Sequence, residues 1–222
     1  MHFKKSMRLT LALVSATYVI PSHAAITTYT DQAAFLNALN GATIFQDSFS
    51  DVGAGSPLSL TRTGNGLTVT YTAPVSGLFT IPGEISSFMN VDHLRATLGS
   101  GIFAAGGNFY MTDINGNFQP YPGLTTSANA SNGIDPISTL SASTNSTSTF
   151  FGWISTTPLT VVISTSGGSS PARWNTIDNF IVATAPAPAA PGPLPLFGAL
   201  GAMAWSRRLR QRVVAGRSSQ VH

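Results

Sequence analysis

Apolar residues alternate with hydroxyl-bearing residues along much of this chain. In Leu67–Thr72, apolar residues and threonines follow one another at a period of two. In a strand this period places the apolar side chains on one face and the hydroxyls on the other. The segment is therefore expected to form a half-buried β-strand.

Short apolar segments of the same kind recur between turn-forming residues. The further expected strands are 43–49, 58–62, 78–81, 102–111, 137–143, 150–154, 159–165 and 177–183. Glycine and asparagine at 64–66 and 115–116, and paired glycines at 167–168, favour tight turns because both residue types tolerate a positive φ. Many short strands with regular turn signals predict a mainly β fold, an antiparallel sandwich of the jelly-roll kind.

In one segment before these strands, the apolar residues recur at the spacing of a helix instead. Its apolar stripe consists of Ala34, Phe35, Ala38 and Leu39. The hydroxyl of Thr30 is expected to cap the N-terminus, with Asp31 in the first turn, and Gly41 is expected to end the helix. The sequence thus predicts one short helix before the strands.

The first 24 residues have the order of a secretory signal peptide. A basic start with Lys4, Lys5 and Arg8 is followed by an apolar run of 12 residues, and Ser22-His-Ala24 provides small residues at the cleavage positions. Cleavage is expected between Ala24 and Ala25. The apolar run is short of the roughly 20 residues that span a bilayer, which disfavours a permanent anchor.

The C-terminal region also has three parts. A Pro- and Ala-rich linker at 184–193 is followed by an apolar, transmembrane-like segment at 194–206 and a basic tail at 207–222. The basic cluster consists of Arg207, Arg208, Arg210 and Arg212. An apolar segment followed by arginines is the order of a stop-transfer sequence, with the arginines held in the cytoplasm. The sandwich is therefore expected to occupy 25–183, outside the membrane.

The charge of the chain is concentrated at its two ends. The pI is about 9.6, yet residues 25–190 contain only Arg62, Arg95 and Arg173 against all eight acidic residues. An acidic domain without lysine excludes nucleic acid as its partner. The absence of cysteine excludes a disulfide framework, a thiolate metal site and a cysteine nucleophile.

The C-terminal motif resembles a known sorting signal. Its residues are Pro191, Gly192, Pro193, Leu194, Pro195 and Leu196, and they precede the apolar segment and the arginines. This order is similar to the C-terminal sorting signal of PEP-CTERM proteins, in the variant where Pro-Gly-Pro-Leu-Pro-Leu replaces Pro-Glu-Pro. The resemblance implies export, an inner-membrane-anchored precursor and processing by an exosortase in a Gram-negative bacterium that makes exopolysaccharide. The chain departs from the pattern by ten further residues, 213–222.

Stretches of the middle domain also resemble PEP-CTERM ectodomains. They lie at 28–36, 45–49, 106–117, 150–154 and 174–180. The resemblance implies a jelly-roll sandwich of the sort that includes carbohydrate-binding modules. Similar domains often pair an early and a late acid-bearing strand and bind a structural calcium near them. Asp47 and Asp178 are the candidate ligands that this resemblance implies, and two solvent-facing acids on adjacent strands are the alternative.

Catalytic constellations are scarce in the sequence. His93 is the one histidine within 25–183, and its neighbour Asp92 is expected to point to the other face of a strand. The carboxylates that a glycosidase could pair are Asp47, Asp51, Glu84, Asp92, Asp113, Asp135 and Asp178, but spacing alone does not bring any two together. The segment 113–117 begins like a calcium loop, but it has no glutamate at position 12 and is expected to be a tight turn. The sequence therefore predicts a protein that is not an enzyme and has no cofactor besides the candidate calcium.

Aromatic residues give the main alternative. Those that could stack on a sugar are Phe109, Tyr110, Phe118, Tyr121, Phe150, Phe151, Trp153 and Trp174, and at least half of them are expected in the core. The favoured function is an exported, non-enzymatic envelope or matrix protein that associates with exopolysaccharide and is found at the cell surface or outside the cell. A carbohydrate-binding module is the alternative, favoured by exposed aromatics on one face. A polysaccharide-active hydrolase is the third reading and requires two carboxylates in a cleft.

Overall fold

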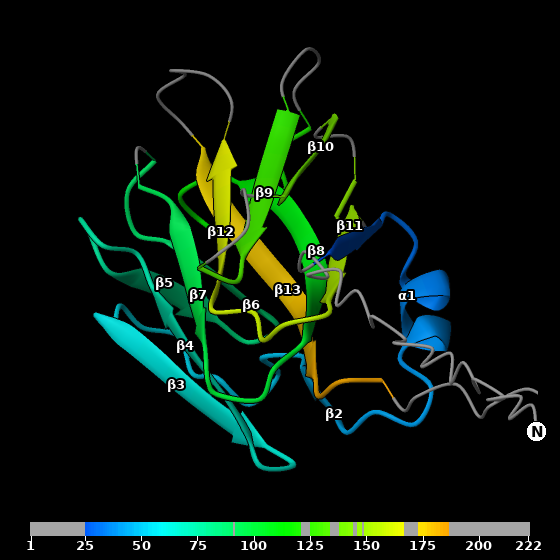
Figure 1. The fold of residues 1–222 in the computed structure, drawn as a ribbon. Helices are drawn as coiled ribbons and strands as arrows, with labels where there is room; N and C mark the ends of the chain where they lie inside the picture. Colours follow the sequence, from blue (N-terminus) through cyan, green and yellow to red (C-terminus); the bar gives the residue numbers. More distant parts are fainter. Residues whose placement is uncertain are drawn as a thin grey trace, which may run out of the picture. The chain divides into compact units, whose positions relative to one another are not determined.

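Two antiparallel β-sheets pack face to face in the computed structural model (Figure 1), which describes residues 25–90, 92–120, 125–133, 138–143, 146–147, 149–166 and 173–186. By its contacts the chain divides after Ala185, and every described strand belongs to the unit before that point. The predicted class, a mainly β sandwich with one short helix, is confirmed. The inner faces of the two sheets pack against each other, and the outer faces point away from the sandwich.

The larger sheet has seven strands. Along its main path these are β1 (Ile26–Tyr29), β11 (Phe150–Ser155), β8 (Ala104–Thr112), β13 (Trp174–Ala183), β6 (Glu84–Ser87) and β5 (Leu78–Ile81), while β2 (Ile44–Asp47) also pairs with β13. Every pairing is antiparallel. The last strand of the domain therefore lies between β8 and β6, with β2 along its C-terminal half.

The smaller sheet has six strands. In spatial order they are β10 (Ser138–Ser143), β9 (Thr125–Ser131), β12 (Val161–Ser166), β7 (Leu94–Leu98), β4 (Leu67–Thr72) and β3 (Ser59–Gly64). The hairpin between β3 and β4 turns at Asn65 and Gly66, whose φ angles are 52° and 77°. Two positive φ angles define the turn that the Asn-Gly pair predicts, and Gly64 pairs with Leu67 across it.

Four strands were not expected from the sequence: β1, β6, β7 and β9. Apart from its two threonines, β9 consists of serine, alanine and asparagine, which have little strand propensity of their own. Its pairing with β10 on one side and β12 on the other supplies the hydrogen bonds that hold it extended. Tertiary pairing therefore overrides local propensity in this part of the sheet.

The helix α1 (Gln32–Ala38) lies at the β1–β11 side of the larger sheet (Figure 1). Its N-cap is Asp31 and not Thr30 as expected, because the Asp31 carboxylate accepts a hydrogen bond of 2.7 Å from the Ala34 amide. Asp31 has extended backbone angles, which place its side chain within reach of the third helical amide. The helix ends at Ala38 with Leu39 as its C-cap, two residues before the expected Gly41, which has φ 78° in the turn that follows.

The main core lies between the sheets and is rich in aromatic rings. Its largest fully buried side chains include Trp153, Tyr71, Phe109, Phe151 and Phe180, and Phe109 contacts the rings of Phe151, Trp153 and Phe180. Tyr71 and Phe180, from opposite sheets, pack edge to face at 5.6 Å between ring centroids. The aromatic core therefore joins the two sheets.

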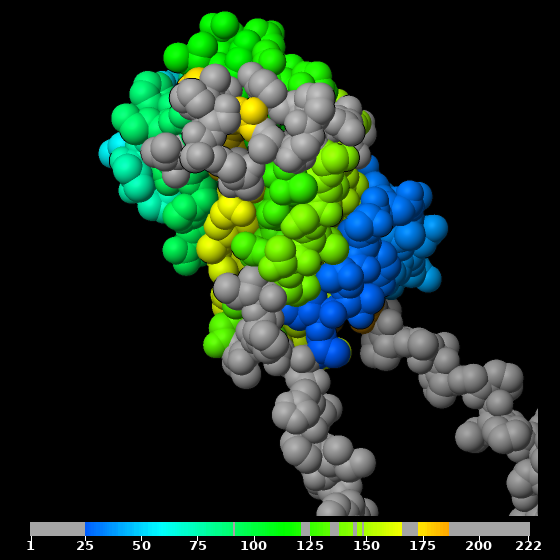
Figure 2. Space-filling model, turned by 90° about the horizontal axis from the view of Figure 1, so that it is seen from above, coloured from blue at the N-terminus to red at the C-terminus, as the bar shows by residue number. Residues whose placement is uncertain are grey.

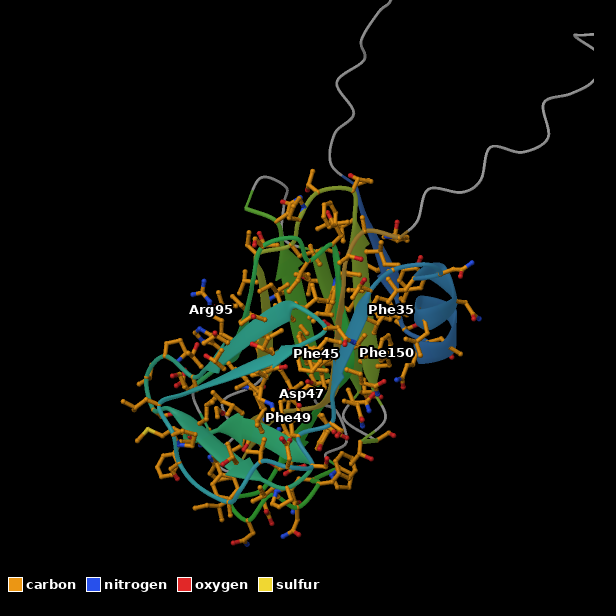
Figure 3. All side chains as sticks on the ribbon, turned by 90° about the horizontal axis from the view of Figure 1, so that it is seen from below. Phe35, Phe45, Asp47, Phe49, Arg95 and Phe150 are labelled. Carbon is orange, nitrogen blue, oxygen red and sulfur yellow. The ribbon has the colours of Figure 1, made fainter. Side chains whose placement is uncertain are left out.

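A second, smaller core lies on the outer side of the larger sheet. Phe35 of α1 packs on Phe150 in this cluster (Figure 3). In the space-filling view the blue atoms at the start of the described chain gather on one side of the molecule (Figure 2). A Cβ on Gly152 would come within 2.8 Å of both rings. Glycine at this position lets the helix approach the sheet closely.

A bulge in β13 keeps its apolar side chains in the main core. The register with β8 shifts between Asp178 and Ile181, and Asn179 at the bulge has φ 48°. Ile177 before the bulge and Phe180 after it both belong to the main core, although they are three positions apart and would face opposite sides of a regular strand. Without the extra residue Phe180 would point to the outer face.

Within the part of the chain that the structure describes, no helix is long and apolar enough to cross a membrane. The apolar segment expected at 194–206 lies outside that part.

Candidate functional site

A small pocket opens on the outer face of the larger sheet. Strand register places its neighbours there: Ser86 pairs with Thr176 and with Phe79, while Ile85 and Ile177, one residue away, are in the main core. The pocket has a volume of about 130 Å³. It is lined by Phe79, Ser86, Phe88, Asp113, Ile114 and Trp174. Three aromatic rings, one carboxylate and one hydroxyl thus surround it.

One of these rings, the indole of Trp174, is held in place by a hydrogen bond. The indole Nε1 of Trp174 donates a hydrogen bond of 3.0 Å to the backbone carbonyl of Phe88. Trp174 is half-buried at the start of β13, while the side chain of Phe88 is 47% exposed directly after β6. Because the indole is anchored by its nitrogen, one aromatic wall of the pocket is oriented before any ligand arrives.

The turn after β8 supplies the polar wall. The carboxylate of Asp113 accepts hydrogen bonds from the backbone amides of Asn115 (2.8 Å) and Asn117 (2.9 Å), and from the side-chain amides of Asn117 and Gln119. The bond from the Asn117 amide leads the causes that lower the pKa of Asp113. The carboxylate is therefore ionised at neutral pH.

This arrangement confirms that 113–117 forms a tight turn, as the sequence predicts. Gly116, with φ 81°, closes the turn against β5 and β6, since a Cβ there would lie 2.7 Å from Ile81 and 3.0 Å from the Glu84 carboxylate. The turn therefore lies directly over the outer face and holds Asp113 and Ile114 at the pocket.

The surrounding face carries further acidic groups. The hydroxyl of Tyr110 donates a hydrogen bond to Glu84, which is half-buried. Burial raises the pKa of Glu84, and the nearby charges of Asp178 and Asp113 raise it further, against the lowering effect of the Tyr110 bond. Burial also raises the pKa of Asp178. An anion approaching this face would thus meet three carboxyl groups.

The structure pairs the strands of Asp47 and Asp178 but does not bring the two carboxylates together. Asp47 lies opposite Phe180, on the inner side of the sheet, whereas Asp178 neighbours Glu84 and Tyr110 on the outer side. The reason is the bulge after Asp178, which turns the following side chains to the other face.

The oxygens of Asp47 already have partners. Both oxygens accept hydrogen bonds from the Arg62 guanidinium, at 3.1 and 3.2 Å, and Oδ1 also accepts from the Phe49 amide. The Asp47 side chain is only 2% exposed. Arg62 also pairs with Asp51, which lowers the pKa of that carboxyl. A calcium ion would have to displace this guanidinium, so the geometry does not favour the calcium site expected from the resemblance. Nor does the described part of the chain contain a group of three or more histidines and acids able to hold a metal ion.

Most of the expected sugar-stacking aromatics belong to the cores. Phe109, Tyr110, Phe150, Phe151 and Trp153 are buried, Phe118 and Trp174 are half-buried, and Tyr121 lies outside the described residues. Trp174 is thus the expected aromatic that reaches the pocket. Phe79 and Phe88 were not expected, because they occupy a short strand and a loop that share no periodic pattern with Trp174 in the sequence.

The neighbours Asp92 and His93 do not form a catalytic pair. Asp92 is buried, and its Oδ2 accepts hydrogen bonds from the amides of Val75 and Ser76 and from the Ser76 hydroxyl. The Asp92 carboxylate thus holds the 74–77 loop by hydrogen bonds, while His93, the next residue, is half-buried. This agrees with the expectation that sequence adjacency does not align the two side chains.

The predicted processing sites lie largely outside the described residues. These are Ala24, the motif Pro191, Gly192, Pro193, Leu194, Pro195 and Leu196, and the cluster Arg207, Arg208, Arg210 and Arg212. Ala25 is described, and its backbone bonds to Thr156 beside β11.

No protein-family model and no curated protein matches the chain. Among solved structures, the chain is similar to TmCBM61 in complex with β-1,4-galactotriose, at 10% sequence identity and a TM-score of 0.21. That match covers 67% of this chain and 92% of the other. A TM-score of this size does not establish a common fold.

Proposed function

We propose that the chain is an exported, non-enzymatic protein of the bacterial envelope or matrix, and that its sandwich binds carbohydrate. The observation that carries the binding function is the outer-face pocket of Phe79, Phe88 and Trp174 with Asp113. Sugar rings have an apolar C–H face and a rim of hydroxyls. Aromatic walls with one fixed carboxylate and one hydroxyl, from Ser86, complement both parts.

The absence of catalysis is part of the proposal. The two carboxyls nearest the pocket are engaged, Asp113 by the amides of its own turn and Glu84 by the Tyr110 hydroxyl. A glycosidase needs one carboxyl to give a proton to the leaving group and a second to act as base or nucleophile. Asp113 has a lowered pKa and four amide donors around it, which suits hydrogen bonding to a sugar hydroxyl better than proton transfer.

Export and sorting are supported by the two ends of the sequence. The signal peptide would bring residues 25–183 across the inner membrane, and the apolar segment with its arginines would hold the precursor there. Signal peptidase and an exosortase-type enzyme are the processing partners of this proposal. The processed protein would reach the cell surface or the exterior and associate with exopolysaccharide.

The binding function is tested with Trp174→Ala in the full chain. Neutral gluco-, galacto-, manno- and xylo-oligosaccharides are titrated by calorimetry, and the variant is expected to weaken the best ligand by roughly 30-fold, as for an anchoring tryptophan. Trp174→Phe keeps a ring and should lose less. Binding that is unchanged in Trp174→Ala, or no binding to any glycan, would contradict the proposal, with circular dichroism confirming that each variant is folded.

Sorting is tested by intact-mass analysis of the protein recovered from its native host. The expected species begins at Ala25 and lacks the C-terminal arginines. Replacing the four clustered arginines by glutamine should let the tail cross the membrane and prevent the second cleavage. A mature species that begins at Ala25 but still ends at His222 would refute the sorting mechanism while leaving carbohydrate binding untouched.

A further inference from the structure

A second concave surface lies on the outer face of the other sheet. It is an open groove of about 490 Å³, lined by Leu58, Thr72, Ala73, Pro74, Val75, Gly77, Arg95 and Thr97. Its floor comes from β4 and β7, and its walls come from the 57–58 and 73–77 segments. The groove is thus separate from the aromatic pocket, which belongs to the larger sheet.

Arg95 provides the charge of this groove. It is exposed in the middle of the sheet, between Thr72 of β4 and Ile163 of β12, and its side chain extends away from the sandwich (Figure 3). Within the described residues no carboxylate pairs with it. Of the described acids, Asp92 is buried behind the 73–77 segment, where its carboxylate accepts from the Val75 and Ser76 amides. The others are elsewhere: Asp31 at the helix, Asp47 and Asp51 at Arg62, and Glu84, Asp113 and Asp178 at the larger sheet.

Among the described residues, the sheet around Arg95 carries no other outward charge, and its β3 and β4 part is covered with hydroxyls. In β3 and β4 the outward positions are all serine or threonine, because they alternate with core residues such as Val69 and Tyr71. Thr61 bonds to Thr70 and Thr63 to Thr68 across the strands, each at 3.1 Å. A single cation in a hydroxyl-covered surface suits a ligand that carries both hydroxyls and negative charge.

The walls of the groove are held in place without a ligand. The Asp92 carboxylate accepts from the amides of Val75 and Ser76, both at 2.8 Å, and the Gly77 amide donates to the Ala73 carbonyl at 2.9 Å. On the other wall the Leu78 amide donates a hydrogen bond of 2.8 Å to the backbone carbonyl of Pro57. A preformed groove loses less conformational entropy when it binds.

The rims of the groove are apolar. Leu58 and Val75 are 82% and 76% exposed, and they are the most exposed large apolar side chains of the described residues. Apolar rims beside a guanidinium offer contact to the C–H surface of an extended chain while Arg95 binds its charge.

We propose that this groove binds a carboxylate-bearing glycan, of the uronic-acid polymer class, with Arg95 holding the carboxylate. The fork of the guanidinium matches the two oxygens of a carboxylate, and Thr72 and Thr97 beside it are placed to bond to sugar hydroxyls. The aromatic pocket, surrounded by acids, takes neutral sugar instead. The sandwich therefore binds two chemically different glycans on its two outer faces. Loss of binding at one site does not imply loss of binding at the other.

The experiment titrates the full chain with oligogalacturonate and, as the matched neutral ligand, oligogalactose of the same length. Wild type is expected to bind oligogalacturonate more tightly at low salt, with affinity falling as salt is added. Arg95→Gln should weaken it by about tenfold or more, and Arg95→Lys by less, since lysine keeps the charge but not the fork. Trp174→Ala should leave oligogalacturonate binding unchanged.

Three results would overturn this second site. One is an Arg95→Gln variant that binds oligogalacturonate as tightly as wild type does. Another is loss of oligogalacturonate binding in Trp174→Ala, which would place the acidic ligand in the aromatic pocket. The third comes from sedimentation: a wild-type chain that self-associates, with Arg95→Gln monomeric and its oligogalacturonate affinity unchanged, would make the groove an interface between two copies.

Discussion

The two outer faces of this sandwich differ in charge, in aromatic content and in how far other segments cover them. The face of the larger sheet carries Glu84, Asp113 and Asp178 with aromatic rings, and it is covered in part by the 113–117 turn and by α1. The face of the smaller sheet is regular, rich in hydroxyls and charged only at Arg95 among the described residues. Because the two sheets share one core, the difference shows how far outer faces diverge once the inner faces are satisfied.

The burial patterns give the physical reason. Strands β4 and β7 alternate between buried and accessible positions, as expected for a sheet with one face in water. Strands β8 and β13 are buried at nearly every position, because helix and turn cover their outer side. A helix and a turn packed on a sheet create a recess with fixed walls. An open sheet gives only a shallow groove, whose walls come from the neighbouring loops.

The largest effect on this contrast is expected from Asp92→Ala. Removing the acceptor of two backbone amides and one hydroxyl should lower the free energy of unfolding by about 2–3 kcal/mol, because the buried donors lose their partner. Urea unfolding measures this loss, and an unchanged slope would show that compactness is unaffected. Ser76→Ala leaves the two amide bonds to Asp92 and removes the hydroxyl, which also accepts from the Met89 amide, so it should cost less than Asp92→Ala, about 1 kcal/mol.

The same variant sharpens the comparison of the faces. Under folding conditions Asp92→Ala should weaken oligogalacturonate binding, since the 74–77 wall is no longer fixed, and leave neutral-sugar binding intact. Equal loss at both sites would show that the two faces are coupled through the core and do not act separately.

A smaller effect is expected from Glu84→Gln on the other face. Burial raises the pKa of Glu84 in the folded chain above its value in the unfolded chain, so the folded state binds the proton more tightly. The stabilising contribution is complete below the unfolded pKa, near the ordinary carboxyl value, and is lost as the pH rises through the folded pKa. At neutral pH the variant should therefore be slightly more stable than wild type, by less than about 1 kcal/mol because solvent screens a half-exposed group.

Thermal unfolding at several pH values checks this effect. Wild type and Glu84→Gln should have similar stability at pH values well below the ordinary carboxyl pKa and should separate above it. Asp178→Asn is a useful second variant, because burial also raises the pKa of that carboxyl. A Glu84→Gln variant that is less stable than wild type at neutral pH would mean that the bond from Tyr110 outweighs the cost of burying the charge.

Particular elements show how far the sequence predicts this fold. Leu67–Thr72 and Leu78–Ile81 have the predicted bounds, because period-two alternation and flanking turn residues are local signals. Thr30 was expected as the helix cap because of its hydroxyl, but the backbone path places the Asp31 carboxylate at the third helical amide. Strands β6 and β9 lack a local signal and depend on their partners in the sheet.

The candidate sites divide in the same way. Trp174 is among the aromatics that the sequence offers for sugar stacking, yet Phe79 and Phe88 join it only through the pairing of β5 with β6 and of β6 with β13. Asp47 and Asp178 are candidate calcium ligands by resemblance because their strands are expected to pair, and the strands do pair. The bulge at Asn179 separates the carboxylates by turning them to opposite faces, which spacing in the sequence does not reveal.

The sequence by itself determined the class of fold, the Asn-Gly hairpin and the concentration of charge at the two ends, because periodicity, turn chemistry and composition are properties of neighbouring residues. The tertiary structure decided which acids meet which partners: Asp47 meets Arg62, Asp113 meets the amides of its own turn, and Arg95 faces solvent among threonines. It also decided that one outer face is recessed and acidic and the other open and basic. Those properties follow from strand order, register and one bulge, and these are set by long-range packing and hydrogen bonding between segments distant in the chain.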